Sequence, residues 1–298
     1  MRMKEKSGDR IFNIINNTVF IVMAIITLYP FIYVLAISLN DSMDTMAGGI
    51  YFLPRKWSLD SYYVIFRHNS LLYAFFMSVL RTFTGTVLCV VSTAMLGYAL
   101  TKKYLVGYKF FYMLFIVSMF LNGGLIPNYM LFKNIHIYNS FAVYILPGLI
   151  GVFYMIIFRT NFMQIPGSML ESAYIDGANE FQVFIRIVMP LSVPILATVG
   201  LFSAVQQWNS WTDTLYFTSS PKLETLQFVL MKILRQSEAA QMVNSAQMDM
   251  LRRKRMVNIS PESVKMAITI VATLPILFVY PFVQKYFIKG MMIGAVKE

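Results

Sequence analysis

The chain has 298 residues, of which 57% are hydrophobic and only 13% are charged, and its formal net charge is +11 at pH 7. A soluble domain carries about 25% charged residues, so this composition excludes an ordinary soluble protein and indicates an integral membrane protein. In a soluble chain the basic excess would suggest nucleic-acid binding. In a membrane protein it first concerns topology, because Lys and Arg are enriched in cytoplasmic loops.

Six apolar stretches are long enough for membrane helices, which need about 20 mostly apolar residues. They are residues 17–39, 72–100, 107–124, 139–159, 191–211 and 264–284. The first run is charge-free over residues 11–40, which is too long for the core of a signal peptide, so this span is expected to be retained. Within the third stretch, NGGLIPNY at residues 122–129 predicts a helix end followed by a short interfacial segment.

The loops between these spans favour one orientation. Six spans place both termini on one side of the membrane, together with the loops 101–106 and 160–190. Lys and Arg are equally numerous on the two sides unless the long polar segment 212–262 is discounted as a translocated loop. With that segment discounted, the positive-inside rule favours cytoplasmic termini. Ser260-Pro261-Glu262 predicts the N-cap and first turn of the last helix.

The stretch from Glu171 to Pro190 is amphipathic at helical spacing. Its apolar face comprises Leu170, Ala173, Tyr174, Gly177, Ala178, Phe181, Ile185 and Val188, and its polar face comprises Glu171, Asp176, Asn179, Glu180, Gln182 and Arg186. Asp176-Gly177 supplies a turn in the middle. We therefore expect a short helix, a turn and a second short helix, with one side suited to a groove on a soluble partner. A plain surface helix joining two spans is the alternative.

The same stretch resembles the EAA loop of ABC-importer permeases, whose pattern is Glu-Ala-Ala, Gly, Ile and Leu-Pro at fixed spacing. Here the pattern is met by Glu171-Ser172-Ala173, Gly177, Ile187 and Met189-Pro190, with Ser172 and Met189 as mild departures. The resemblance implies an all-α membrane protein with six transmembrane helices and a cytoplasmic coupling loop at residues 166–190. It also implies that the loop docks on an ATPase subunit through Glu171, Ser172, Ala173, Asp176, Gly177, Ile187 and Pro190.

Other segments are similar to the carbohydrate branch of these permeases. They are LPGLIGVFYMIIFRTNFMQIP at 146–166, LSVPILA at 191–197, QQWNSW at 206–211 and the tail YFIKGMMIGAVKE, in which Glu298 stands where Gly is usual. The resemblance implies import of an oligosaccharide delivered by an extracytoplasmic solute-binding protein. It also implies a second homologous permease and two ATPase subunits that hold ATP and Mg, with no cofactor on this chain. The expected location is the bacterial cytoplasmic membrane, with lipid contacts and no nucleic acid.

The outer end of the fifth span concentrates amide, carboxylate and aromatic side chains, which suit sugar hydroxyls and ring faces. The candidate pathway residues are Gln207, Trp208, Asn209, Trp211 and Asp213. Trp208 and Trp211 are three residues apart and are expected to share a helix face. A membrane-interface aromatic belt is the alternative explanation of the two tryptophans.

The segment 212–262 is the largest polar part of the chain. One amphipathic helix is predicted in it from the spacing of Leu226, Leu230, Ile233 and Leu234. A second amphipathic helix is expected over residues 241–255. The basic run Arg252-Arg253-Lys254-Arg255 is either a solvated face or a contact with an acidic partner. In the maltose importer that this family includes, the corresponding loop reaches the binding protein, so the resemblance implies that contact for these four residues.

The chain lacks the residues that would energise transport by itself. All 14 Asp and Glu residues lie outside the predicted spans, whereas ion-coupled carriers usually need carboxylates near the membrane midplane. There is no glycine-rich phosphate loop and no metal-binding motif. These features favour a transport subunit, not an enzyme, powered by another protein. The alternatives are a permease for another solute class, such as peptides or amino-acid-like compounds, and an ion-coupled secondary carrier.

The expected organisation has three parts. Residues 1–70 hold the N-terminal cytoplasmic segment, the first span and the first external loop. Residues 71–284 form the core permease domain, with the coupling loop 166–190 and the external loop 212–262. Residues 285–298 form a cytoplasmic tail. The single cysteine, Cys89, lies in an apolar run and is expected to be a small core residue.

Overall fold

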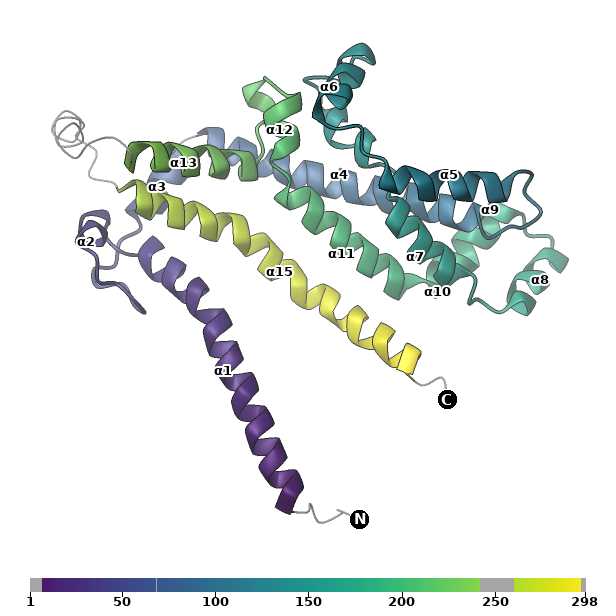
Figure 1. Ribbon diagram of the computed structural model, residues 1–298, viewed down its shortest axis with the longest axis horizontal. Coiled ribbons are helices and arrows are strands. Elements are labelled where there is room, and N and C mark those ends of the chain that lie inside the picture. Colours follow the sequence, from purple (N-terminus) through teal and green to yellow (C-terminus); the bar gives the residue numbers. More distant parts are fainter. Residues whose placement is uncertain (1–6, 68, 242–259, 296–298) are drawn as a thin grey trace. The chain divides into compact units, whose positions relative to one another are not determined.

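A computed structural model describes residues 7–67, 69–241 and 260–295 of the chain (Figure 1). These residues are mostly helical, and the described part has no strand beyond an isolated antiparallel bridge between Asn40 and Trp57. The chain divides into two compact units. Unit 1 comprises residues 1–69 and 232–273, and unit 2 comprises residues 70–231 and 274–298. The predicted all-helical class is therefore confirmed, whereas the predicted boundaries do not coincide with this division.

Unit 1 contains the helices α1 (Ser7–Ser38), α2 (Ser42–Met46) and α3 (Asp60–Arg67), together with the end of α13 (Leu226–Gln241) and the start of α15 (Pro261–Ala295). Most apolar side chains of α1 are exposed until its last turns, where Ala36 and Ile37 pack with Ile50. The predicted cap of the last helix is confirmed, because the Ser260 hydroxyl accepts a hydrogen bond from the Glu262 N–H at 3.2 Å.

Unit 2 contains the remaining helices. They are α4 (Asn69–Ala99), α5 (Tyr108–Phe120), α6 (Leu125–Asn134), the 3₁₀ turns η1 (Phe141–Tyr144) and η2 (Leu146–Gly148), α7 (Val152–Phe162), α8 (Gly167–Ile175), α9 (Glu180–Val183), the π-helix η3 (Phe184–Val188), α10 (Met189–Leu191), α11 (Val193–Asn209), α12 (Thr212–Phe217) and η4 (Pro221–Leu223). The first part of α13 and the end of α15 complete the unit.

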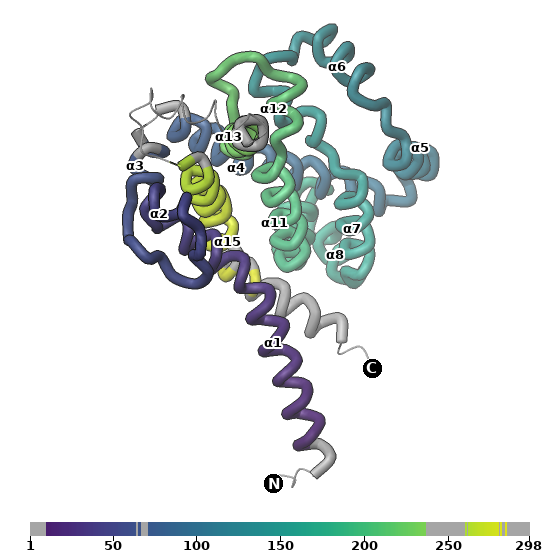
Figure 2. The backbone as a smooth tube through the Cα atoms, turned by 60° about the vertical axis from the view of Figure 1, so that its left-hand side comes forward, coloured from purple at the N-terminus to yellow at the C-terminus, as the bar shows by residue number. Residues whose placement is uncertain are grey.

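The main core of unit 2 joins α4, α7, the segment α9–η3 and α11. Figure 2 labels α4, α7 and α11 along the backbone. Its buried members are Ala94, Tyr98, Phe158, Phe162, Val183, Phe184, Val188 and Val199. At Gly97 the backbones of α4 and α7 come close, since a Cβ at this position would lie 3.1 Å from the Cβ of Phe158 and 3.2 Å from the Met155 carbonyl oxygen. This glycine sets the distance between the two helices. Cys89 is a free, buried cysteine, as expected.

Three helical segments of the described chain are long and apolar enough to cross a membrane: Arg10–Ser38, Leu71–Ala99 and Glu262–Val279. Two bent pairs raise this number to five if each pair is one span: Phe141–Gly148 with Val152–Phe162, bent by 47°, and Glu180–Leu191 with Val193–Asn209, bent by 83°. The apolar helix α5 has only 13 residues. It ends where NGGLIPNY begins, and α6 follows as a separate helix, so the predicted break is confirmed. The count of six spans stays a prediction.

Candidate functional site

The predicted helix, turn and second helix in residues 166–190 are present as α8, a turn at Gly177 and α9. Gly177 has φ +83°, a left-handed conformation that side chains other than Gly rarely adopt. The Ala178 N–H donates to the Ala173 carbonyl at 2.9 Å, and the Gly177 N–H donates to the Tyr174 carbonyl at 3.0 Å. These two bonds form a Schellman motif, which ends α8 at Asp176 and turns the chain.

A capping box starts the second helix. The Asn179 carboxamide oxygen accepts from the Gln182 N–H, and the Gln182 side-chain oxygen accepts from the Asn179 N–H, both at 2.9 Å. The two donors would otherwise be unpaired at the helix start. Together with the glycine turn, this box fixes the shape of the loop from local sequence alone.

The predicted apolar face is correct for the first helix and wrong for part of the second. Leu170, Ala173, Tyr174 and Ala178 pack against the core of unit 2, and Val188 is buried in it. Phe181 and Ile185, in contrast, are 59% and 48% exposed. Val183 and Phe184 are buried in their place. The turn at Gly177 interrupts the helical register, and the π-helix that follows adds a residue to the turn, so a single 3.6-residue period does not extend across both helices.

The predicted ATPase-coupling residues fall into two groups. Glu171, Ser172, Asp176, Gly177 and Pro190 are exposed, whereas Ala173 and Ile187 are partly buried against the core of unit 2. The exposed group is therefore accessible to a partner, whereas Ala173 and Ile187 anchor the loop to the core of unit 2. Sequence reasoning missed Ile175, which is 86% exposed at the end of α8, directly before the turn.

A second region of unit 2 surrounds a polar cavity of about 520 Å³. Its lining comes from α4, α6, the η1–η2 segment, α7, α11 and α12. The polar and aromatic members are Arg81, Asn128, Phe132, Tyr144, Tyr154, Ser203, Gln206, Gln207, Ser210, Thr212, Asp213 and Phe217. The cavity therefore combines hydrogen-bond donors and acceptors with aromatic rings.

Arg81 organises one wall of this polar cavity. Its side chain is only 2% exposed and forms an ion pair with Asp213, whose side chain is 34% exposed. The guanidinium also donates to Gln207 Oε1 at 2.9 Å and to the Ser210 carbonyl at 3.3 Å, and it lies 4.4 Å from the centre of the Tyr144 ring. Its partner Asp213 lies 132 positions further along the chain, so the spacing of the two residues in the sequence gives no sign of this pairing.

The five predicted pathway residues do not stay together. Gln207 and Asp213 line the polar cavity. Trp208 is buried, packs edge to face on Phe75 with ring centres 6.0 Å apart, and lines a different cavity. Asn209 is exposed and accepts a hydrogen bond from Gln227 at 3.3 Å.

The prediction that Trp208 and Trp211 share a helix face is wrong. Helix α11 ends at Asn209, and Ser210 is extended with ψ 122°, so Trp211 starts the next helix in another direction. The aromatic rings that line the polar cavity are instead those of Phe132, Tyr144, Tyr154 and Phe217.

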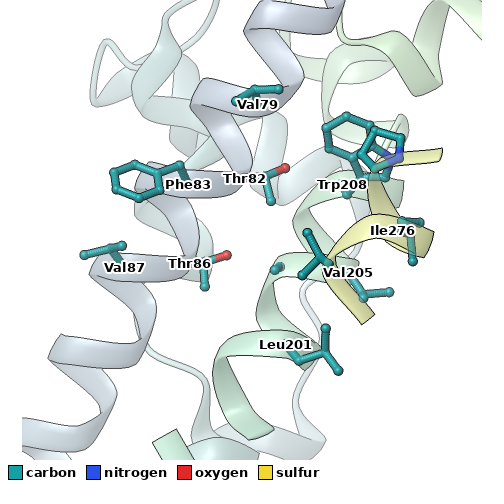
Figure 3. Close-up of a pocket in the computed structure, with 12 residues that line it drawn as sticks. Val79, Thr82, Phe83, Thr86, Val87, Leu201, Val205, Trp208 and Ile276 are labelled. Atoms are coloured by element: carbon teal, nitrogen blue, oxygen red, sulfur yellow. The ribbon is translucent and has the colours of Figure 1, made fainter. Parts of the chain in front are cut away.

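The second cavity, of about 320 Å³, is almost wholly apolar and lies between α4, α11 and α15 within unit 2 (Figure 3). Leu201, Val205 and Trp208 line it from α11, and Ile276 lines it from α15. Two hydroxyls of α4, those of Thr82 and Thr86, are buried without a hydrogen-bond partner among the described residues. Such a lining suits lipid or side-chain methyl groups better than sugar hydroxyls.

The long segment after α12 is described only in part. The predicted amphipathic helix is present as α13, whose first residue, Leu226, is buried and donates its N–H to Ser78 Oγ at 2.8 Å. The second expected helix and the basic run of residues 252–255 lie outside the described residues. Among the residues that are described, no group of three His, Cys, Asp or Glu could hold a metal ion.

Comparisons with known proteins agree on one family. Residues 2–293 match the family described as "Binding-protein-dependent transport system inner membrane component". The chain is 34% identical to the polygalacturonan/rhamnogalacturonan transport system permease protein YtcP of Bacillus subtilis, over 97% of this chain and 99% of the relative. It is also 34% identical to protein LplC of the same organism, over 99% and 98%.

A solved structure is similar as well. It belongs to a bacterial ABC transporter involved in the import of the acidic polysaccharide alginate. The match has a TM-score of 0.84 and 26% identity, and it covers 95% of this chain and 99% of that one. A second chain, from an alginate ABC transporter in complex with an alginate pentasaccharide-bound periplasmic protein, matches at a TM-score of 0.55 and 14% identity and supports the fold alone. The chain therefore belongs to the binding-protein-dependent transport system inner membrane component family: it is a multi-pass permease subunit of an ABC importer and not an enzyme.

Proposed function

We propose that this permease forms part of the membrane pathway for an oligosaccharide that an external binding protein delivers. The relatives support this substrate class, since their names refer to polygalacturonan and rhamnogalacturonan, to arabinooligosaccharides and to alginate. The partners would be a second permease and two ATPase subunits, which hold ATP and Mg. This chain would contribute six spans, cytoplasmic termini and the helical loop around Gly177 as the contact with an ATPase.

The observation that carries the proposal is the polar cavity of about 520 Å³. Sugar sites pair aromatic faces with side chains that bond hydroxyls. Tyr144 and Tyr154 provide the rings, Gln206 and Gln207 provide amides, and Asp213 provides an accessible carboxylate. An apolar lining, such as that of the second cavity, would not compensate sugar hydroxyls for the loss of water.

Reconstitution of the whole importer in proteoliposomes tests this function. Labelled neutral arabinooligosaccharides, oligogalacturonides and a peptide mixture would be offered with the binding protein, with and without ATP inside. We expect ATP-dependent uptake of an oligosaccharide. Uptake of peptide alone would show another solute class, and uptake driven by an ion gradient without ATP would show a secondary carrier.

Two variants test the cavity itself. Gln206 is exposed in the polar cavity, and Gln206→Leu should lower uptake up to about tenfold, because one lost hydrogen bond costs about 0.5–1.5 kcal/mol. Thr82→Val is the matched control. It removes a hydroxyl that lacks a partner in the apolar cavity and keeps the side-chain volume, so uptake should stay at the wild-type rate. Equal uptake in both variants would remove the polar cavity from the pathway.

A further inference from the structure

One carboxylate ties the helical loop to the end of α4. Glu180 is the first residue of α9, and its Oε2 accepts hydrogen bonds from the hydroxyls of Tyr98 at 2.6 Å and Tyr174 at 2.9 Å. The Lys102 ammonium lies 3.0 Å from the same oxygen, and the Tyr104 hydroxyl donates to Oε1. Four donors from three segments of the chain thus converge on a single side chain.

The donors define which parts are joined. Tyr98 lies in the last turn of α4, Lys102 and Tyr104 lie in the turn after it, and Tyr174 belongs to α8. Lys102 Nζ also donates to the Tyr174 hydroxyl at 2.6 Å and lies 4.7 Å from the centre of the Tyr98 ring. The Glu180 cluster, meaning these four residues and Glu180, therefore holds both short helices of the loop against the end of α4.

Simple stabilisation of the fold is a weak explanation for this cluster. The Glu180 side chain is 46% exposed, and an ion pair this exposed adds little to stability because water screens the two charges. The adjacent core already holds the loop through Val183 and Phe184, which are buried. The cluster instead fixes the orientation of the start of α9, because four donors bind one carboxylate from defined directions.

The charge on Glu180 is permanent under physiological conditions. Burial raises the pKa of this carboxyl, but the hydrogen bonds from Tyr104, Tyr98, Lys102 and Tyr174 outweigh it and lower the pKa to about 2. The carboxylate that accepts these bonds is therefore present throughout the neutral range.

We propose that Glu180 is a positioning residue of transport, which passes movement of the loop turn into α4. Helix α4 runs without interruption from Asn69 to Ala99 and also carries Arg81 at the polar cavity. Tyr98 and Arg81 are 17 residues apart on this helix, or about 26 Å at 1.5 Å per residue. If α4 is rigid and bound to the loop at Tyr98, a movement of the loop shifts the whole helix and therefore also the cavity wall at Arg81. This inference rests on the proposed function, in which the loop contacts an ATPase.

The test compares neighbouring residues in the reconstituted importer. Glu180→Gln removes the charge, Lys102→Gln removes one donor, and Tyr104→Phe removes one hydroxyl from a ring that is mostly exposed. Lys103→Gln is the matched control, since Lys103 is exposed and lies beside Lys102 in sequence. The readout is the number of oligosaccharides imported per ATP hydrolysed. We expect a loss of about fivefold for Glu180→Gln, smaller losses for the two donor variants, and the wild-type ratio for the control.

A structural role alone would not change that ratio, because poorly assembled complexes lose transport and hydrolysis together. Hydrogen exchange of the purified importer provides the second readout. Amides of residues 167–191 should exchange faster in Glu180→Gln than in Lys103→Gln. Wild-type exchange of the loop, or faster exchange with an unchanged ratio, would overturn the inference. A wild-type importer that takes up no oligosaccharide would instead overturn the proposed function, so the two failures can be told apart.

Discussion

Asp213→Ala and Arg81→Met remove opposite halves of one ion pair, and the difference in exposure of the two side chains predicts unequal costs. Asp213→Ala leaves a guanidinium that is 2% exposed without its counter-ion. Breaking a buried pair in this way costs about 3–5 kcal/mol, because the remaining charge is neither paired nor hydrated. The bonds to Gln207 and Ser210 remain but do not neutralise the charge.

Arg81→Met should cost less. The carboxylate that remains on Asp213 is one-third exposed and keeps a hydrogen bond from the Ser210 hydroxyl at 2.8 Å, so water can replace the guanidinium. The main loss is the hydrogen bond from Arg81 to Gln207, which should lower the free energy of unfolding by about 1–2 kcal/mol. Methionine keeps most of the side-chain volume and packs well beside the Tyr144 ring. The expected difference between the two variants is therefore about 2–3 kcal/mol.

Thermal unfolding of the purified chain in detergent measures this difference. Each kcal/mol shifts Tm by about 2–4 °C for a chain of this size, so Asp213→Ala should melt about 4–12 °C below Arg81→Met. Because membrane proteins often unfold irreversibly, the midpoints must be compared at one heating rate. Asp176→Ala, which removes an exposed carboxylate, is the control and should change Tm little. A Tm for Arg81→Met equal to or below that of Asp213→Ala would refute the reasoning from exposure.

Two glycine substitutions test backbone geometry. Gly177→Val should strain the left-handed turn by about 1–2 kcal/mol and lower both ATPase stimulation and uptake. Gly177→Asn should retain both activities, because Asn tolerates this conformation. A Cβ at this position meets no atom within 4 Å, so equal losses of activity in the two variants would contradict backbone strain as the cause. Gly97→Ala should cost about 1–3 kcal/mol in thermal unfolding, because its Cβ would press on Phe158 and the Met155 carbonyl. Gly200→Ala, which has space for a Cβ, should be neutral or stabilising by about 0.5–1 kcal/mol, and equal effects at the two glycines would contradict this packing argument.

The sequence by itself determined the membrane class, the resemblance to a permease family and several helix ends. These features depend on local chemistry. A low charged fraction excludes an ordinary soluble protein. Ser260 and Pro261 start a helix, and Gly177 ends one because Gly adopts φ +83° without strain. The helix–turn–helix of the loop follows from the same local rules and was predicted from spacing.

Only the tertiary structure decided which side chains meet. Arg81 pairs with Asp213, which is 132 positions away in the sequence. Glu180 accepts a hydrogen bond from the hydroxyl of Tyr98, which is 82 positions away. Neither pairing has a periodic signal in the sequence. The face of a helix is also fixed by its surroundings. A break at Ser210 separates Trp208 from Trp211, and the turn at Gly177 shifts the register of the second helix so that Val183 and Phe184 are buried. Burial is set by the neighbouring helices and not by the period of a single segment.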